Sequence, residues 1–227
     1  MGQVAEMNSG DGHSPTVSYH AIVDQKQVDF ADANPAGRQM LAAAGCHPAD
    51  DFALIWLEKH GTRSIGLDER VDLRGPHEKA FRTFKSDRVF HFTIDGRGYE
   101  WGAAVIPGPE LREIAHVLED DVLVVEHPGG KETVLGPDDQ LDLAGPETKH
   151  LRMKKRLITV FYDNDPKIIP AGVYTTEQLK EKFEVPAGYL LNVVSEHGQL
   201  ETLKPGQHLR VREGMKFFSQ APGGGSA

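Results

Sequence analysis

Residues 67–76 read LDERVDLRGP, and the closely similar GPDDQLDLAGP occupies residues 136–146. A looser version, KPGQHLRVREG, follows at residues 204–214. The late glycine of each version is separated from the next by 70 and then by 69 residues. A fixed period of this length is typical of a chain built from copies of one structural unit. The sequence therefore predicts three successive units.

A second repeated marker lies in the same phase as the first. The sequences EKHG, EHPG and EHG begin at residues 58, 126 and 196. Two markers in phase make a chance repeat improbable and allow boundaries to be drawn. We expect three domains, preceded by a disordered tail and followed by a flexible glycine tail. The ranges, in chain order, are residues 1–17, 18–86, 87–155, 156–220 and 221–227.

Each unit has the same predicted order of strands around one helix. Two short strands flank a turn, which in the second unit contains the favourable hairpin dipeptide Asp95-Gly96. These strands are expected at residues 19–23 and 27–30, 89–94 and 99–101, and 157–162 and 167–169. After the helix we expect an apolar central strand at residues 52–57, 122–125 and 189–194. A further strand and a closing strand follow, the closing strand at residues 80–84, 150–153 and 215–218.

The predicted helices are short, and each shows its own signals. In the first unit Asn34 is expected to cap the helix, Pro35 to take its first position and Gly45 to end it. In the third unit Thr175 and Gln178 have the spacing of a capping box. The second helix shows an apolar stripe at helical spacing, formed by Leu111, Ile114, Ala115 and Leu118.

This order of elements predicts an α+β fold in which each unit packs a mixed sheet on one helix. A unit of about 70 residues has a small core, near the lower limit for independent folding, so neighbouring units are expected to lean on one another. The joints at residues 85–88 and 154–156 are short and charged. We therefore expect beads with limited mutual motion.

Composition excludes several classes of protein. The 227 residues include 39% hydrophobic and 26% charged residues, which is enough for folding, and the net charge is −9. This acidic balance argues against a nucleic-acid or anionic membrane surface. The single cysteine, Cys46, excludes an internal disulfide framework and a cysteine-rich zinc site. With no apolar run of membrane-spanning length and no signal peptide, we expect a cytoplasmic protein.

The candidate catalytic and metal-binding residues have simpler structural explanations. Cys46-His47 follows a helix end, and adjacent side chains seldom point at one another. The repeated His60, His127 and His197 recur because the unit recurs, so a role in a turn is favoured over a metal site. Paired acids such as those at residues 120–121 and 138–139 fall in loops. We expect no enzyme, no metal and no bound cofactor.

The last six residues read Pro222-Gly223-Gly224-Gly225-Ser226-Ala227 and follow the predicted closing strand of the third unit. Glycine has no β-carbon, so such a run can thread a narrow enzyme crevice and present a carbonyl to a nucleotide or a nucleophile. The alternatives are a frayed terminus and a cloning scar of the glycine-serine kind.

The element order, the threefold repeat and the glycine tail together resemble the bacterial multiubiquitin proteins, which carry several ubiquitin-like β-grasp domains in one chain. The resemblance covers about residues 18–225. It implies three tandem β-grasp domains and a protein modifier conjugated through its C-terminal glycine to target proteins. The implied partners are a ubiquitin-activating-like enzyme, a conjugating-like enzyme and a deubiquitinase-like metalloprotease, with ATP consumed by the activating partner.

The resemblance also implies roles for the tail residues. Ser226 and Ala227 would be removed as a processing extension, and Gly225, or alternatively Gly224, would be activated and conjugated. Pro222 and Gly223 would enter the activating enzyme. Ubiquitin's usual tail carries arginines before its glycines, whereas this chain has Gln220-Ala221-Pro222, which argues against recognition by a eukaryotic activating enzyme.

The closing strands of the first two units have no Gly-Gly after them, so the chain should act as one long modifier. Gly129-Gly130 lies in the repeated turn, where glycine serves backbone geometry. Two other functions stay open. One is a non-covalent scaffold that presents three β-grasp binding faces with an inert tail. The other, less favoured, is a sulfur carrier, because single β-grasp proteins with terminal Gly-Gly carry thiocarboxylates.

Overall fold

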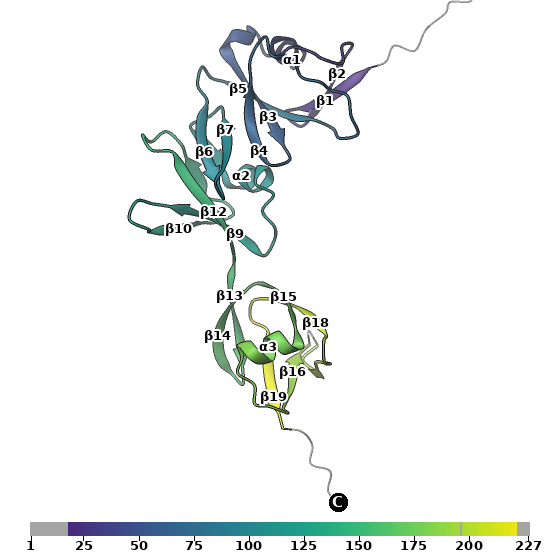
Figure 1. Ribbon diagram of the computed structural model, residues 1–227, viewed down its shortest axis with the longest axis vertical. Helices are drawn as coiled ribbons and strands as arrows, with labels where there is room; N and C mark the ends of the chain where they lie inside the picture. The colour runs from purple at the N-terminus through teal and green to yellow at the C-terminus, as the bar shows by residue number, and fades with distance from the viewer. Residues whose placement is uncertain (1–17, 196, 222–227) are drawn as a thin grey trace, which may run out of the picture. The chain divides into compact units, whose positions relative to one another are not determined.

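The computed structural model describes residues 18–195 and 197–221 (Figure 1). By their internal contacts these residues form two compact units. The N-terminal unit runs as far as Ala115 and includes Gln140–Lys149, and the C-terminal unit consists of His116–Asp139 and the chain from His150 onward. Below, the first, second and third repeats denote residues 18–86, 87–155 and 156–220.

The N-terminal unit is built on seven strands in the order β6-β7-β4-β3-β5-β1-β2. Their bounds are Tyr19–Val23 (β1), Lys26–Phe30 (β2), Phe52–Glu58 (β3), Gly61–Ile65 (β4), Ala80–Lys85 (β5), Phe90–Ile94 (β6) and Arg97–Trp101 (β7). A two-stranded ribbon pairs β8 (Val105–Pro107) with β11 (Gln140–Asp142). The helices are α1 (Gly37–Ala43), the 3-10 helix η1 (Ala49–Asp51) and α2 (Gly108–Ile114).

The C-terminal unit contains strands in the orders β10-β9-β12 and β14-β13-β19-β16-β17. The first group comprises Asp121–Glu126 (β9), Glu132–Leu135 (β10) and Lys149–Lys155 (β12). The second comprises Leu157–Tyr162 (β13), Asp165–Pro170 (β14), Leu190–Val194 (β16), Leu200–Thr202 (β17) and Lys216–Gln220 (β19). A ribbon pairs β15 (Gly172–Thr175) with β18 (His208–Val211), and the helix is α3 (Thr176–Lys182).

The predicted α+β character, with mixed sheets and few helices, is confirmed. In the first repeat β1 pairs in parallel with β5, and in the third β13 pairs in parallel with β19, while the neighbouring pairs are antiparallel. Strands β1 and β13 begin and end where the sequence predicts them. The ribbons β8–β11 and β15–β18 were not predicted, because three or four residues show too little alternation to stand out.

The capping prediction for the first helix is wrong. Helix α1 begins at Gly37 and its N-cap is Ala36, whose amide donates to Oε1 of Gln39 at 2.8 Å. The carbonyl of Pro35 accepts the amide of Val71, and that of Asn34 accepts Arg70 Nη1. These contacts with a distant loop hold residues 34–35 outside the helix, where a local capping signal has no effect.

The other helix signals are confirmed except at one position. Gly45 follows the end of α1 with φ of +84°, a conformation that glycine favours at helix ends. Thr175 and Gln178 form the predicted capping box of α3. In the second repeat α2 ends at Ile114, so Leu118 lies beyond the helix and is 64% exposed instead of completing the apolar stripe.

Each of the outer repeats has a core between its helix and one face of its sheet. In the first repeat Met40 and Leu41 of α1 meet Leu54 and Phe81 of the central strands. In the third repeat α3 lies over the sheet, and its Leu179 joins a cluster that contains Ile158, Val160, Ile169, Leu191, Val193 and Phe217 (Figure 1). Because strand residues alternate between faces, the neighbours of these core residues form a second, helix-free face of each sheet.

Two features concern the edges of these sheets. Thr62 of β4 pairs in parallel with Tyr99 of β7, so the first repeat and the start of the second share a sheet. At this joint the repeats lean on one another, as expected for units of this size. At the other end of the chain β14 is an edge strand that contains Pro166 and Pro170.

Among the described residues, no helix is both long and apolar enough to cross a membrane.

Candidate conjugation site and the interfaces between repeats

The predicted conjugation residues lie outside the described residues. These are Pro222, Gly223, Gly224, Gly225, Ser226 and Ala227. The structure describes the strand from which they continue, β19, and the residue Ala221 after it. The glycine run follows β19 in the sequence, so the residues at the end of this strand are the described residues nearest to it along the chain.

Strand β19 is anchored close to its end by Asp163. Ser219 donates its amide to Asp163 Oδ1 at 3.1 Å and its hydroxyl to Oδ2 at 2.9 Å. The first repeat contains the same arrangement, in which Thr83 donates its amide and hydroxyl to Asp24 at 2.9 and 2.6 Å. A hydroxyl residue two positions after the buried aromatic of the closing strand is the sequence signal, and our sequence reasoning missed it.

A buried amide adds a second anchor on the helix-free face. Asn192 of β16 is 2% exposed, accepts the hydroxyl of Thr202 at 2.6 Å and donates to Gln220 Oε1 at 3.4 Å. Gln220 also lies opposite Leu190 in the strand register. A buried amide is tolerated because its polar atoms are paired, and here the pairing ties three strands together next to the glycine run.

The closing strand of the first repeat ends in a packed interface with the second repeat. The Arg82 side chain of β5 is 9% exposed and donates from Nε to Glu110 Oε1 of α2 at 2.6 Å. Its Nη2 lies 3.5 Å from Glu113 Oε1. A guanidinium this deeply buried needs carboxylate partners, and both come from the second repeat.

Glu100 of β7 forms the second polar contact of this interface. Its Oε2 accepts the amide and the hydroxyl of Ser64, each at 2.6 Å. Burial alone would raise the pKa of Glu100, but the hydrogen bonds from Ser64 and the charges of His91 and Arg63 outweigh it, and the pKa is lowered. Thr62 exchanges two further hydrogen bonds with the backbone of Glu100, at 2.5 and 2.9 Å. The Glu100 carboxylate is therefore favoured in its ionised form at this interface.

An aromatic contact completes the interface. The rings of Phe84 and Trp101 meet edge to face with their centroids 4.7 Å apart. Gly102 lies directly on the ring of Phe84, so close that a β-carbon there would be 2.5 Å from Phe84 Cδ2. We call the contacts of Arg82, Glu100, Glu110, Phe84 and Trp101 the repeat 1–2 seam. Sequence reasoning did not find this seam, because its partners are far apart in the chain.

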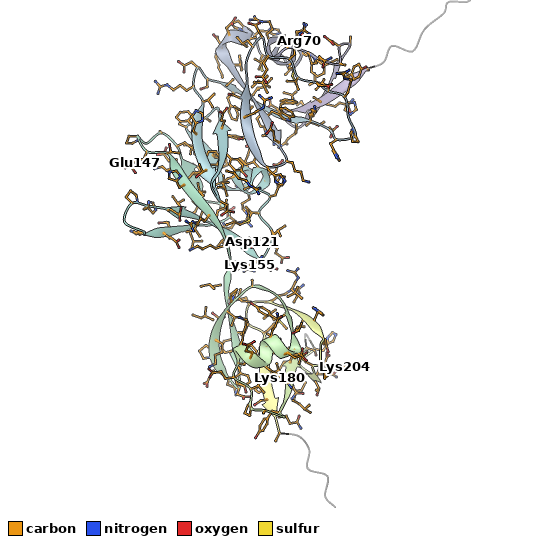
Figure 2. All side chains as sticks on the ribbon, viewed as in Figure 1. Arg70, Asp121, Glu147, Lys155, Lys180 and Lys204 are labelled. Carbon is orange, nitrogen blue, oxygen red and sulfur yellow. The ribbon has the colours of Figure 1, made fainter. Side chains whose placement is uncertain are left out.

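The joint between β12 and β13 consists of one residue, Arg156. Its amide donates to the carbonyl of Asp120 at 2.8 Å, and its own carbonyl accepts the amide of Ala171 at 2.7 Å. Lys155 and Asp121 form an ion pair of 2.6 Å beside it, and Figure 2 shows the two residues together. Arg210 of the third repeat pairs with Asp120. No glycine run interrupts this joint, and its backbone is hydrogen-bonded on both sides.

The candidates set aside from the sequence have structural roles. Cys46 is 7% exposed, belongs to the core of the first repeat and contacts Thr83 Oγ1 at 3.5 Å. In residues 18–195 and 197–221 no group of three or more His, Cys, Asp or Glu side chains has the geometry of a metal site. His127 closes a turn, with its amide bonded to the carbonyl of Lys131 and its ring to Thr133.

The internal glycine pair and Asp139 serve turns, as predicted, whereas the prediction for Asp121 is wrong, because this residue begins β9, is 7% exposed and pairs with Lys155. Asp139 accepts the amide of Gly136 at 2.8 Å, and Glu69 accepts that of Gly66 at 3.2 Å, so both acids stabilise the loop before a repeated LDL or VDL stretch. Gly129 and Gly130 have φ of +83° and +80°, which glycine adopts without strain. Gly129-Gly130 is thus explained by the backbone of a turn.

The recurring element order and the mixed sheets define a protein built from repeated sheet-and-helix units. The model of the multiubiquitin family matches residues 19–86 and 90–153, more than half of the chain. The chain belongs to the multiubiquitin family. Among proteins with curated annotation, none matches it closely.

Proposed function

We propose that the protein is a ubiquitin-like modifier with three tandem β-grasp domains, joined to target proteins through the glycine run that follows β19. Membership of the multiubiquitin family supports the ubiquitin-like character of the units. The third unit lies outside the residues that the family model matches, and its order of elements supports its inclusion. Its elements β13, β14, α3, β16, β17 and β19 occur in the same order as β1, β2, α1, β3, β4 and β5 of the first repeat.

The observation that carries the proposal is the position of the glycine run. Gly223-Gly224-Gly225 follows the closing strand of the third repeat after two residues, Ala221 and Pro222. The closing strand of the second repeat is instead followed after one residue by the next strand, and that of the first repeat is packed into the seam. The chain therefore offers one place where an enzyme crevice can receive glycine residues next to a folded domain.

The proposed chemistry uses the carboxylate of Gly225, with Gly224 as the alternative. A peptidase, of the metalloprotease kind in the proposed system, cuts after Gly225 and releases Ser226-Ala227. The carboxylate attacks the α-phosphorus of ATP in the activating enzyme, and pyrophosphate leaves. A thiol or hydroxyl of a partner then displaces AMP, and an acceptor nucleophile on the target displaces that partner. ATP belongs to the activating enzyme, and this chain supplies the carboxylate.

Intact mass spectrometry tests the proposal. The protein is incubated with purified candidate activating, conjugating and protease partners, with and without ATP. We expect loss of the Ser226-Ala227 mass, followed by ATP-dependent adducts that map to Gly225. Gly224→Ala with Gly225→Ala should abolish the adducts, and Ala221→Ser, a change beside the glycine run, should leave them unchanged. Adducts that persist in the double glycine variant would overturn the proposal.

The non-covalent scaffold is the second candidate, and one observation favours it. Ile168 and Leu157 of the third repeat are 71% and 66% exposed, which is unusual for large apolar side chains on a sheet. If the protein stays at its full mass with every partner and ATP present, yet binds one of them, the scaffold function replaces the modifier.

A further inference from the structure

The closing strand of the third repeat loses its neighbour on one side before it ends. In the strand register β19 pairs with β13 at Lys216 and Phe217, and the amide of Asp163 donates to the carbonyl of Phe217 at 2.9 Å. Asp163 and Asn164 then turn the chain away from β19, with φ of +48° and +72°. The last three residues of β19, 218–220, therefore pair in the register with β16 alone.

The carboxylate of Asp163 takes the place of the missing strand. Ser219 donates its amide to one oxygen and its hydroxyl to the other, at 3.1 and 2.9 Å. Hydrogen bonds to a carboxylate are stronger than those to a neutral acceptor. The Asp163 side chain thus extends the hydrogen bonding on this side of β19 by two residues past Phe217.

A buried amide holds the last residue of the strand from the other side. Asn192 of β16 is 2% exposed, and its Nδ2 donates to Oε1 of Gln220 at 3.4 Å. Its Oδ1 accepts the hydroxyl of Thr202 at 2.6 Å. Fraying of β19 would leave Nδ2 of Asn192 without this partner, and an unpaired buried amide is unfavourable. The paired form of β19 is therefore favoured as far as Gln220.

This buried amide occurs in the repeat that precedes the glycine run. In the register, one buried residue of each central strand lies opposite the same position of its closing strand, and the pairs are Ile55–Arg82, Val124–Arg152 and Asn192–Phe218. An isoleucine or a valine fills this place in the first two repeats. Packing of the sheet alone therefore does not require an amide here. We call the contacts of Asp163 and Asn192 with Ser219 and Gln220 the tail clamp.

We infer that Asp163 and Asn192 are positioning residues for the conjugation reaction, and that the tail clamp fixes the reach of the glycine run. The inference rests on the proposed function and adds to it the residues that present the tail. Because β19 is paired as far as Gln220, five residues extend from its end to Gly225, which is a span of at most about 18 Å. Loss of pairing at Ser219 and Gln220 would lengthen this segment to a span of about 25 Å.

A fixed reach matters because of the geometry of the proposed reaction. The carboxylate of Gly225 attacks the α-phosphorus of ATP, and attack requires the two reacting atoms to be aligned and about 3–3.5 Å apart. Every residue that is free before the reaction must be ordered inside the crevice, with a loss of conformational entropy. The tail clamp orders residues 219 and 220 in advance, so fewer residues remain to be ordered when the enzyme receives the tail.

The first measurement needs no enzyme. Hydrogen exchange of single amides is followed by NMR in the full chain, for the wild type, Asp163→Ala and Asn192→Val. We expect exchange at least tenfold faster at Ser219 in the first variant and at Gln220 in the second, with the buried Val160 and Val193 unchanged. Exchange that stays at the wild-type rate, or that rises equally at the two valines, would show that the clamp does not hold the strand end, and the inference would be wrong.

The second measurement asks whether the clamp positions the tail for reaction. In ATP–pyrophosphate exchange with the purified activating enzyme, both variants should lower kcat at least fivefold with KM nearly unchanged. The reason is that the enzyme still binds the protein while the carboxylate is less often aligned.

Two further variants serve as controls. Asp24→Ala removes the same pair of hydrogen bonds, there from Thr83, at a residue with the same left-handed φ of +49°. The closing strand of that repeat has no glycine run after it, so kcat should not change. Ser219→Thr keeps the hydroxyl that Thr83 supplies in the first repeat, and it should retain the wild-type kcat.

The remaining outcomes distinguish this inference from the proposed function. A KM that rises at constant kcat would assign Asp163 and Asn192 to a binding surface, and the inference would be wrong. An unchanged kcat in variants whose strand end exchanges faster would also overturn it, and the proposed function would stand. A wild-type protein that is never activated would remove both.

Discussion

Arg82 of the first repeat and Glu110 of the second meet through a hydrogen bond of 2.6 Å between Nε and Oε1. The arginine side chain is 9% exposed and the glutamate 28%. This pair lies at the centre of the seam, beside the Phe84–Trp101 contact and the hydrogen bonds of Glu100. It makes the first repeat and the start of the second one structural body.

Replacing Arg82 by alanine should therefore destabilise the protein. Glu110 would lose its partner while still partly buried, and we expect a loss of about 2 kcal/mol in the free energy of unfolding. Arg152→Ala is the control, since this arginine is 60% exposed and paired across the surface, and should cost less than about 0.5 kcal/mol. Denaturant titrations measure both. Equal effects would show that the Arg82 pair does not hold the seam.

Gly102→Ala tests the aromatic part of the seam. The added methyl group would meet three atoms of Phe84 at 2.5 to 2.7 Å, so the ring or the backbone must move. Overpacking of this kind costs about 1–3 kcal/mol. Gly98→Ala, on the preceding strand, meets nothing within 4 Å and should be neutral. A Gly102→Ala protein with unchanged stability would mean that the ring of Phe84 moves aside freely.

The seam should weaken in acid because of Glu100. Its pKa in the folded protein lies below the ordinary value of 4.5, so the folded state binds the proton less tightly than the unfolded state. The stabilisation is therefore complete above about pH 4.5 and is lost as the pH falls through the lowered pKa. The amide proton of Ser64, bonded to Glu100 Oε2, should report this transition by NMR.

Glu100→Gln is the control for the acid transition. It keeps an acceptor for Ser64 but cannot ionise in this range, so the titration of the Ser64 amide should disappear. If the amide still shifts at the same pH in the variant, a different group is responsible.

Ser219→Ala and Thr83→Ala form a matched pair. Each removes one hydroxyl hydrogen bond to an aspartate, Asp163 or Asp24, and each should cost about 1 kcal/mol. Only Ser219 lies next to the start of the glycine run, so we expect only Ser219→Ala to alter activation by the enzyme. Activation that falls equally in both variants would trace the effect to general stability.

The sequence predicted what depends on neighbouring residues. The hairpin at Asp95-Gly96 and the capping box at Thr175 and Gln178 are local, and both are present. The predictions that Asn34 caps the first helix and that Pro35 begins it were wrong. A loop 36 residues away, at Arg70, determines the positions of these two residues. A local rule gives no information about such a contact.

The surfaces between repeats were beyond prediction from the repeat alone. The repeat implies that the three units have the same faces, whereas Ile55 is buried, Arg152 is ion-paired and Phe218 is half-buried. The signal was present at one position, as Arg82, Arg152 and Phe218, but its meaning depends on which unit packs on which. The glycine run was recognised from the sequence, and its role awaits the mass-spectrometric test.

Pro166 and Pro170 in the edge strand β14 have a consequence for folding on the ribosome. An apolar sheet with a free edge invites pairing with similar strands of neighbouring nascent chains. Proline has no amide hydrogen, so this edge lacks two of the donors that a cross-chain ladder requires. The third repeat can therefore expose Ile168 and Leu157 while resisting the strand exchange and aggregation to which tandem repeats are prone.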